Sequence, residues 1–110
     1  NLKLPTLPEY SESHVWHLFQ VAIDFCAVGR SRGEVMRDLA AQGIGTQVLY
    51  IPLYHQPYYA PMVNEPLPGT EAFYDCTLAV PMYPELEDEE VDWIASKIEA
   101  IVSNRGTPPA

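Results

Sequence analysis

The residues best suited to bind a small molecule lie between Gly43 and Tyr59, in the segment GIGTQVLYIPLYHQPYY. Its tyrosines and its histidine can stack on a ring, hydrogen-bond a hydroxyl or contact a phosphate. Pro52 and Pro57 exclude a helix or a central strand over its second half. Rings and polar groups on a stiffened loop are typical of binding sites. We therefore predict that the segment forms one wall of a site, with three consecutive binding residues: Tyr54, His55 and Gln56. Tyr58 and Tyr59 could equally bind a ligand or cover a hydrophobic edge.

The other side chains that could do chemistry lack a recognised pattern. His14 and His17 are three residues apart, and on a strand that odd spacing places them on opposite faces, which favours packing over metal binding. Cys26 has no glycine-rich elbow beside it. Neither of the two lysines, Lys3 and Lys97, resembles a buried amine suited to a Schiff base. The residues alone therefore predict no catalytic centre and no metal site.

Three segments have the composition of strands that could position this loop. Residues 14–25 and 46–51 are rich in β-branched and aromatic residues, and a shorter apolar run covers 78–82. Residues 54–69 contain four prolines and are predicted to be a loop.

Helices are predicted between and after these strands. Ser31 and Glu34 have the spacing of a capping box, and that helix should end at Gly43. A short helix is expected over 70–77 with Thr70 as its cap. A longer one is expected from Asp88 to Asn104, where the acidic start suits the helix dipole. This order predicts a small two-layer α+β domain, with about three mainly antiparallel strands and helices on one face.

Composition limits the class of protein. A length of 110 residues favours one domain. The net charge of -9 argues against nucleic acid and against anionic membrane surfaces. No apolar run is long enough for a membrane span, and the N-terminus does not resemble a signal peptide. Cys26 and Cys76 do not form a CxxC pair, which favours reduced thiols and a cytoplasmic location. Residues 1–13 are polar and interrupted by prolines, so we expect an interdomain linker and a chain that starts in mid-protein.

Three stretches of the sequence, in this order, resemble one enzyme family. They are HVWHLFQV (14–21), SRGEVMRDLAAQGIGTQVLYIPLYHQPYY (31–59) and AFYDCTLAVPMYPELEDEEVDWI (72–94). Together they are similar to the C-terminal part of DegT-type sugar aminotransferases, which are pyridoxal-phosphate enzymes of the aspartate-aminotransferase fold. The segment YIPLYHQPYY most resembles the branch that makes 4-amino sugars for pseudaminic acid.

The resemblance implies that residues 14–110 are the small C-terminal domain of such an enzyme. The large domain, which is absent from this sequence, would supply the Schiff-base lysine and hold pyridoxal phosphate, so these residues alone should be inactive. The full-length enzyme, a homodimer, would transfer an amino group from glutamate to a keto-sugar nucleotide, UDP-4-keto-6-deoxy-N-acetylhexosamine. The substrate-binding residues that the resemblance implies are Tyr50, Tyr54, His55 and Gln56. Many family members have a histidine where this chain has Leu49, so no contact is implied from that position.

Two other functions stay open at this point. The chain could be a free-standing regulatory module whose loop binds a metabolite without turnover. It could also be a structural dimerisation domain that buries Trp16 or Trp93 in an interface. A regulatory module should bind a sugar nucleotide saturably as the isolated chain, and a structural domain should dimerise by itself.

Overall fold

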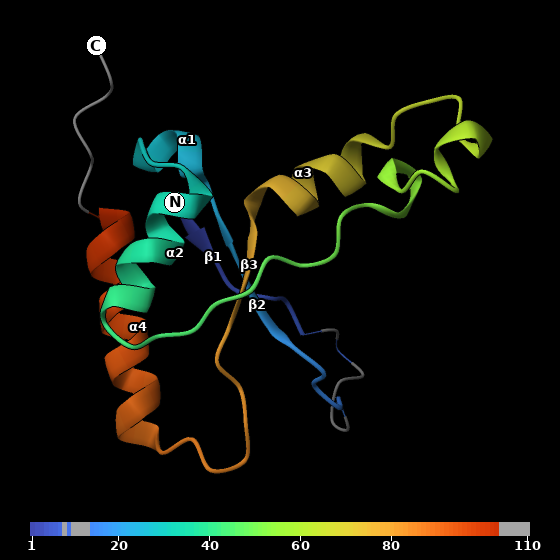
Figure 1. Cartoon of the computed structure of the whole chain (residues 1–110). Coiled ribbons are helices and arrows are strands. Elements are labelled where there is room, and N and C mark those ends of the chain that lie inside the picture. Colours follow the sequence, from blue (N-terminus) through green and yellow to red (C-terminus); the bar gives the residue numbers. More distant parts are fainter. Residues whose placement is uncertain (8, 10–13, 104–110) are drawn as a thin grey trace.

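The computed structural model describes residues 1–7, 9 and 14–103, and a three-stranded antiparallel sheet lies at its centre (Figure 1). The strands are β1 (Leu2–Lys3), β2 (Phe19–Ile23) and β3 (Thr77–Val80), in the spatial order β1-β2-β3. Leu2 pairs with Ile23, and Val21 pairs with Leu78. β2 is therefore the central strand, and its odd-numbered residues share one face.

Two helices cover that face of the sheet. α2 (Arg32–Ala41) and α4 (Asp88–Ser103) lie side by side in Figure 1 and pack their apolar stripes against the strands. The shared core consists of fully apolar side chains from every layer: Val21, Ile23, Val28, Val35, Leu39, Ile44, Leu78, Ile94, Ile98, Ile101 and Val102. The expected small two-layer α+β domain is thus confirmed.

The start of α2 follows the prediction closely. The Ser31 hydroxyl accepts a hydrogen bond from the Glu34 backbone N–H, and the Glu34 carboxylate accepts one from the Ser31 backbone N–H at 2.7 Å. After α2, Gly43 has a φ of 80°, a left-handed conformation that favours glycine. That turn sends the chain from the helix back toward β3.

The strand boundaries differ from the prediction. The segment predicted as a strand over 14–25 forms a strand only from Phe19, and Phe25 already begins the short helix α1 (Phe25–Val28). The strand expected over 46–51 is reduced to a single antiparallel bridge between Gln47 and Ala79. Beyond that bridge the chain leaves the sheet, because β3 is short and Pro52 has no N–H to pair.

The third strand comes from the beginning of the chain. Leu2 and Lys3 pair with β2, although two residues are too few for periodicity to reveal a strand. Residues 8 and 10–13 lie outside the described residues, so a linker over 1–13 stays a prediction.

Two predicted helix caps were wrong by one to three residues. The third helix, α3 (Pro68–Cys76), begins at a proline, and Leu67 rather than Thr70 occupies its cap position without a side-chain hydrogen bond. Proline suits the first turn, where an N–H would have no helical partner. α4 begins at Asp88, so Glu87 precedes it and donates its backbone N–H to the Glu90 carboxylate at 3.0 Å. The predicted end at Asn104 lies outside the described residues.

The segment between the sheet and α3 projects from the body of the domain, and we call residues 50–67 the arm (Figure 1). It contains two single-turn 3-10 helices, η2 (Leu53–His55) and η3 (Ala60–Met62). α3 then leads the chain from the arm back into β3. No helix among the described residues has both the length and the apolar character needed to cross a membrane.

Candidate functional site

A cluster of three polar side chains joins the base of the arm to α3. The Tyr54 hydroxyl donates a hydrogen bond to Oε1 of Glu71, and His55 places Nε2 at 2.6 Å from the same oxygen. The Tyr54 and His55 rings lie side by side, with centroids 4.7 Å apart and planes tilted by 34°. The structure therefore brings together two of the predicted site residues, on one carboxylate.

The local backbone explains how consecutive residues reach one partner. Pro52 is buried and starts η2, and the His55 N–H donates to the Pro52 carbonyl at 2.9 Å. This tight turn directs Tyr54 and His55 to the same side. Glu71 lies in the first turn of α3, where its own N–H donates to the Leu67 carbonyl at 3.1 Å.

The electrostatics of the cluster indicate the protonation states of Glu71 and Tyr54 near neutral pH. Hydrogen bonds from Tyr54 and from His55 lower the pKa of the Glu71 carboxyl below its ordinary value of 4.5. Partial burial raises the pKa of the Tyr54 phenol above 10.0, and the hydrogen bond to Glu71 is the second cause of this rise. Glu71 is thus an ionised acceptor, and Tyr54 is a neutral donor.

The other two predicted site residues lie apart from this cluster. The Tyr50 side chain is 86% exposed and precedes the turn. Gln56 is exposed and ends η2, where its carbonyl accepts from the N–H groups of Tyr59 and Ala60. Among the described residues, the side chains of Tyr50 and Gln56 make no hydrogen bond. Their role in binding stays a prediction.

Glu71 is the residue that sequence reasoning missed. It is 17 positions from Tyr54 and 16 from His55, and it belongs to a different element. One signal pointed to it: a loop rich in hydrogen-bond donors is followed by a carboxylate in the first turn of the next helix. A donor cluster that is partly shielded from water needs such an acceptor.

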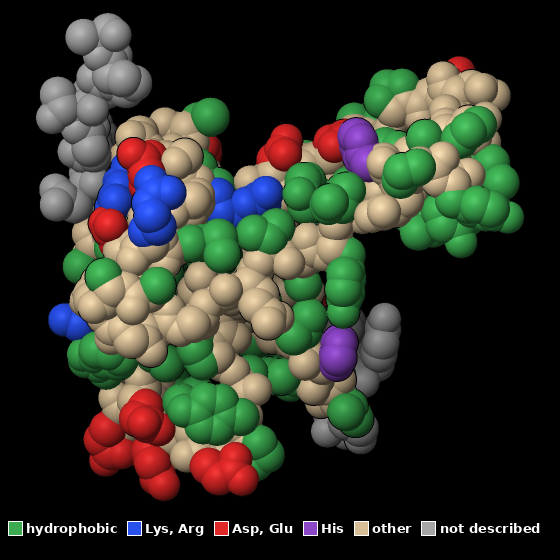
Figure 2. Space-filling view, in the orientation of Figure 1, with side chains coloured by type: hydrophobic (Ala, Val, Ile, Leu, Met, Phe, Trp, Pro, Cys, Tyr) green, Lys and Arg blue, Asp and Glu red, His purple; other side chains and the backbone are tan. Residues whose placement is uncertain are grey.

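Apolar side chains dominate the outer part of the arm. Tyr58 and Tyr59 meet edge to face, with ring centroids 5.0 Å apart, and Tyr58 is 73% exposed. Figure 2 shows hydrophobic side chains gathered at the end of the projecting segment. The exposed large apolar residues of the arm are Tyr50, Ile51, Leu53, Tyr58, Tyr59, Met62, Val63 and Leu67.

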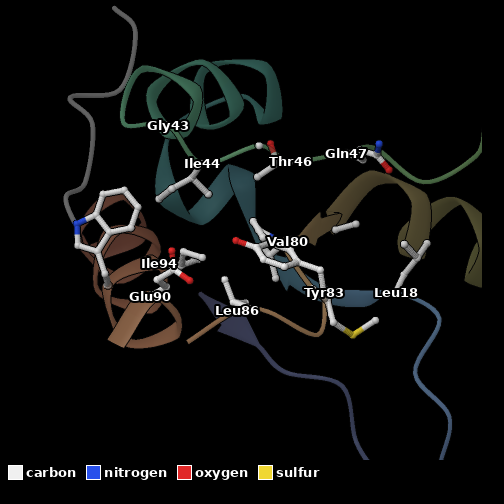
Figure 3. A pocket seen from close by; sticks show the side chains of 15 residues that line it. Leu18, Gly43, Ile44, Thr46, Gln47, Val80, Tyr83, Leu86, Glu90 and Ile94 are labelled. Carbon is white, nitrogen blue, oxygen red and sulfur yellow. The ribbon is translucent and has the colours of Figure 1, made fainter. Parts of the chain in front are cut away.

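A pocket of about 570 Å³ lies at the start of the segment from Gly43 to Tyr59 (Figure 3). Its walls are the turn at 43–47, the chain at 79–83 that ends β3, and the first turns of α4. Ile44, Leu86 and Ile94 provide apolar contact. Thr46, Gln47, Tyr83 and Glu90 provide polar groups. The segment from Gly43 to Tyr59 thus lines a pocket at its start and carries the Tyr54–His55 pair further on.

His14, His17 and the two cysteines do not come together into a site among the described residues. His14 and His17 are exposed in a stretch without regular structure, and the His14 ring instead lies 4.3 Å from that of Trp16. No group of three possible metal ligands occurs within the described residues. Cys26 and Cys76 are both free thiols.

The two lysines also lack the surroundings of a Schiff-base amine. The Lys97 ammonium lies 5.8 Å from the centre of the half-exposed Trp93 ring, on α4. Lys3 is exposed on the edge strand β1.

Comparison with known proteins gives a family and a fold. The family described as the DegT/DnrJ/EryC1/StrS aminotransferase family matches residues 1–99. An aminotransferase of that type from Brucella abortus is 25% identical, with a TM-score of 0.76 over 96% of this chain and 26% of its own. PseC of Helicobacter pylori, an aminotransferase involved in the biosynthesis of pseudoaminic acid, is 26% identical, with a TM-score of 0.69 over 79% of this chain and 24% of its own.

A third similar structure is the PLP form of Spr1654, a putative sugar aminotransferase from Streptococcus pneumoniae. It is 25% identical, with a TM-score of 0.68 over 83% of this chain and 24% of its own. The chain therefore spans about a quarter of the length of each of these proteins.

Proposed function

This chain belongs to the DegT/DnrJ/EryC1/StrS aminotransferase family, and from that membership we propose that it is the small domain of a nucleotide-sugar aminotransferase. The observation that carries the proposal is the family match over residues 1–99, nearly the whole chain. The similarity to PseC and to a sugar aminotransferase from Streptococcus supports a sugar as the amino acceptor.

The substrate we propose is a keto-sugar nucleotide, UDP-4-keto-6-deoxy-N-acetylhexosamine, with glutamate as the amino donor. The similarity to PseC supports this choice of sugar. In the reaction the keto carbon of the sugar gains the amino group, and glutamate becomes 2-oxoglutarate.

Pyridoxal phosphate is the cofactor that we propose for the enzyme, since a PLP form of one similar protein is known. The described residues of this chain do not fit it. A site for this cofactor needs an enclosed amine for the Schiff base, and both lysines lie at the surface or beside an exposed ring. We therefore assign the cofactor's lysine to a part of the enzyme other than these 110 residues.

The contribution of this chain is then to bind and orient the sugar nucleotide. Tyr54 and His55 face the same side of the arm and are held there by Glu71, as hydrogen-bonding groups that need no rearrangement. Tyr50 and Gln56 are further contact residues on the same loop. The surrounding rings would reduce the access of water to the bound sugar.

We also propose that the enzyme is a homodimer and that the arm contacts the other subunit. The exposed apolar side chains of the arm support this, because monomeric proteins rarely leave such a contiguous surface uncovered.

The proposal is tested with the purified enzyme that contains this chain. It is supplied with pyridoxal phosphate, glutamate and the UDP-linked keto sugar, and the products are separated and identified by mass spectrometry. We expect an amino-sugar nucleotide and an equal amount of 2-oxoglutarate. Saturable binding of the sugar nucleotide without any amino transfer would instead support the regulatory module.

A further inference from the structure

The Tyr54–His55–Glu71 cluster has a hydrogen-bonding polarity that follows from its geometry. An ionised carboxylate only accepts hydrogen bonds. Oε1 of Glu71 is the partner of both neighbours. The Tyr54 hydroxyl and Nε2 of His55 must therefore each carry a proton and donate it to this oxygen. Glu71 thereby sets the orientation of the Tyr54 hydroxyl and, in the neutral ring, the tautomer of His55.

This arrangement determines what the cluster offers to a ligand. In the neutral His55 ring, Nδ1 is left as an acceptor, and the second carboxylate oxygen of Glu71 is an acceptor too. Among the described residues neither atom has a hydrogen-bond partner. The side chains remain reachable, since 49% of His55 and 33% of Glu71 is exposed. With the neutral His55 ring, the cluster therefore presents acceptors and carries a negative charge.

Acceptors and a negative charge suit one part of a sugar nucleotide and disfavour another. Hydroxyl and amide N–H groups are donors, whereas a diphosphate is an anionic acceptor that this cluster would repel. We propose that Glu71 is a positioning residue and that the cluster recognises hydrogen-bond donors on the hexose ring rather than the diphosphate. This inference rests on the proposed function and adds a residue and a ligand group to it.

Equilibrium binding to the enzyme that contains this chain tests the inference without requiring turnover. The probes are UDP-4-keto-6-deoxy-N-acetylhexosamine, supplied without an amino donor, and UDP alone, both at about pH 8, where an ordinary histidine side chain is mostly neutral. The variant is Glu71→Gln, because an amide can donate to His55 and reverse the polarity of the ring. The matched control is Glu65→Gln, which changes an exposed carboxylate on the arm.

We expect Glu71→Gln to weaken binding of the sugar nucleotide about tenfold, the usual effect of losing an oriented hydrogen bond near a charge. Binding of UDP alone should change by less than about twofold. Glu65→Gln should match the wild type with both probes. Circular dichroism and the visible absorbance of the bound cofactor verify that each variant is folded.

A second measurement separates positioning from general destabilisation. Tyr54→Phe should weaken sugar-nucleotide binding in the wild-type background and have a smaller effect in the Glu71→Gln background, because the two residues act as one unit. Equal weakening of both probes, or no change in either, would overturn the inference. A weakening confined to the binding of glutamate would also overturn it, since the cluster would then bind the amino donor. Each of these results is obtained whether or not the enzyme transfers an amino group to this sugar.

Discussion

At the scale of single residues, the site depends on how Glu71 constrains two neighbours. Without the carboxylate, the Tyr54 hydroxyl and Nε2 of His55 would lose their shared hydrogen-bond partner. With it, both rings are held within hydrogen-bonding distance of one oxygen. The sequence predicted Tyr54 and His55 as binding residues, because together with Gln56 they are consecutive polar residues between Pro52 and Pro57, and that role stays a prediction. It was not sufficient to identify Glu71, whose proximity depends on the path of the arm.

The first prediction concerns the pH range over which Tyr54 and His55 on the arm stay hydrogen-bonded to Glu71 on α3. We call this contact the attachment of the arm. The pKa of Glu71 is lowered in the folded chain, so the attachment should be present above the ordinary value of 4.5 and be lost as pH falls through the lowered value. The pKa of Tyr54 is raised, so its contribution should be present below 10.0 and be lost as pH rises through the raised value.

Two-dimensional NMR of the Tyr54 ring, followed from about pH 7 to about pH 3, tests whether the attachment is lost when Glu71 is protonated. The methyl signals of the buried Val21 report whether the core is still folded. A Tyr54 ring whose environment does not change while Glu71 is protonated would contradict the predicted attachment.

The second prediction concerns the Tyr54 hydroxyl. Tyr54→Phe should raise the Michaelis constant for the sugar nucleotide about fivefold, since one neutral hydrogen bond is lost. The absorbance of the bound cofactor should not change, because this residue is assigned to the sugar. Tyr58→Phe is the control, as it removes a hydroxyl from the more exposed ring next to Tyr59. Steady-state kinetics that show the same constant for both variants would count against Tyr54 as a contact.

At the scale of elements, local signals worked best where the interaction is local. The capping box of Ser31 and Glu34 and the apolar stripe of α4 both depend on residues three or four positions apart, and the structure has both. Strand pairing depends on distant partners. The strand at Leu2 and Lys3 and the shortening of the segment at 46–51 to one bridge could therefore not be found from periodicity.

The third prediction is made for the helix that carries the capping box. Ser31→Ala removes the side chain that accepts from the Glu34 N–H and should lower the free energy of unfolding by about 1 kcal/mol. Ser96→Ala, in the middle of α4, is the control and should change it by less than about 0.5 kcal/mol. Urea denaturation followed by circular dichroism gives both values. Equal stability of the two variants would mean that the cap contributes little.

At the scale of the whole molecule, the domain separates a compact body from a projecting arm. The body buries its apolar residues between the sheet and two helices, whereas the arm exposes most of its own. The carboxylates at the start of α4 lie on the body, away from the arm (Figure 2). The two-layer fold could be predicted from the order of elements. The projection of the arm could not, because prolines reveal an irregular segment but not its direction.

The fourth prediction follows from the exposed surface of the arm. Met62→Asp places a charge in that surface and should shift the enzyme from dimer to monomer, because burying an unpaired carboxylate is costly. Val15→Asp is the control, since Val15 is an 89% exposed apolar residue outside the arm. Sedimentation velocity measures the mass of each variant. A dimer that persists in Met62→Asp at the same concentration would contradict the assignment of the arm to the interface.

The measurement that most directly tests the central claim is two-substrate kinetics of His55→Ala in the enzyme that contains this chain. If this domain binds the sugar side of an aminotransferase site, the Michaelis constant for the keto-sugar nucleotide should rise about tenfold. The Michaelis constant for glutamate and the absorbance of the bound cofactor should stay as in the wild type. A folded His55→Ala variant that loses its cofactor, or one in which only the glutamate constant rises, would contradict the claim.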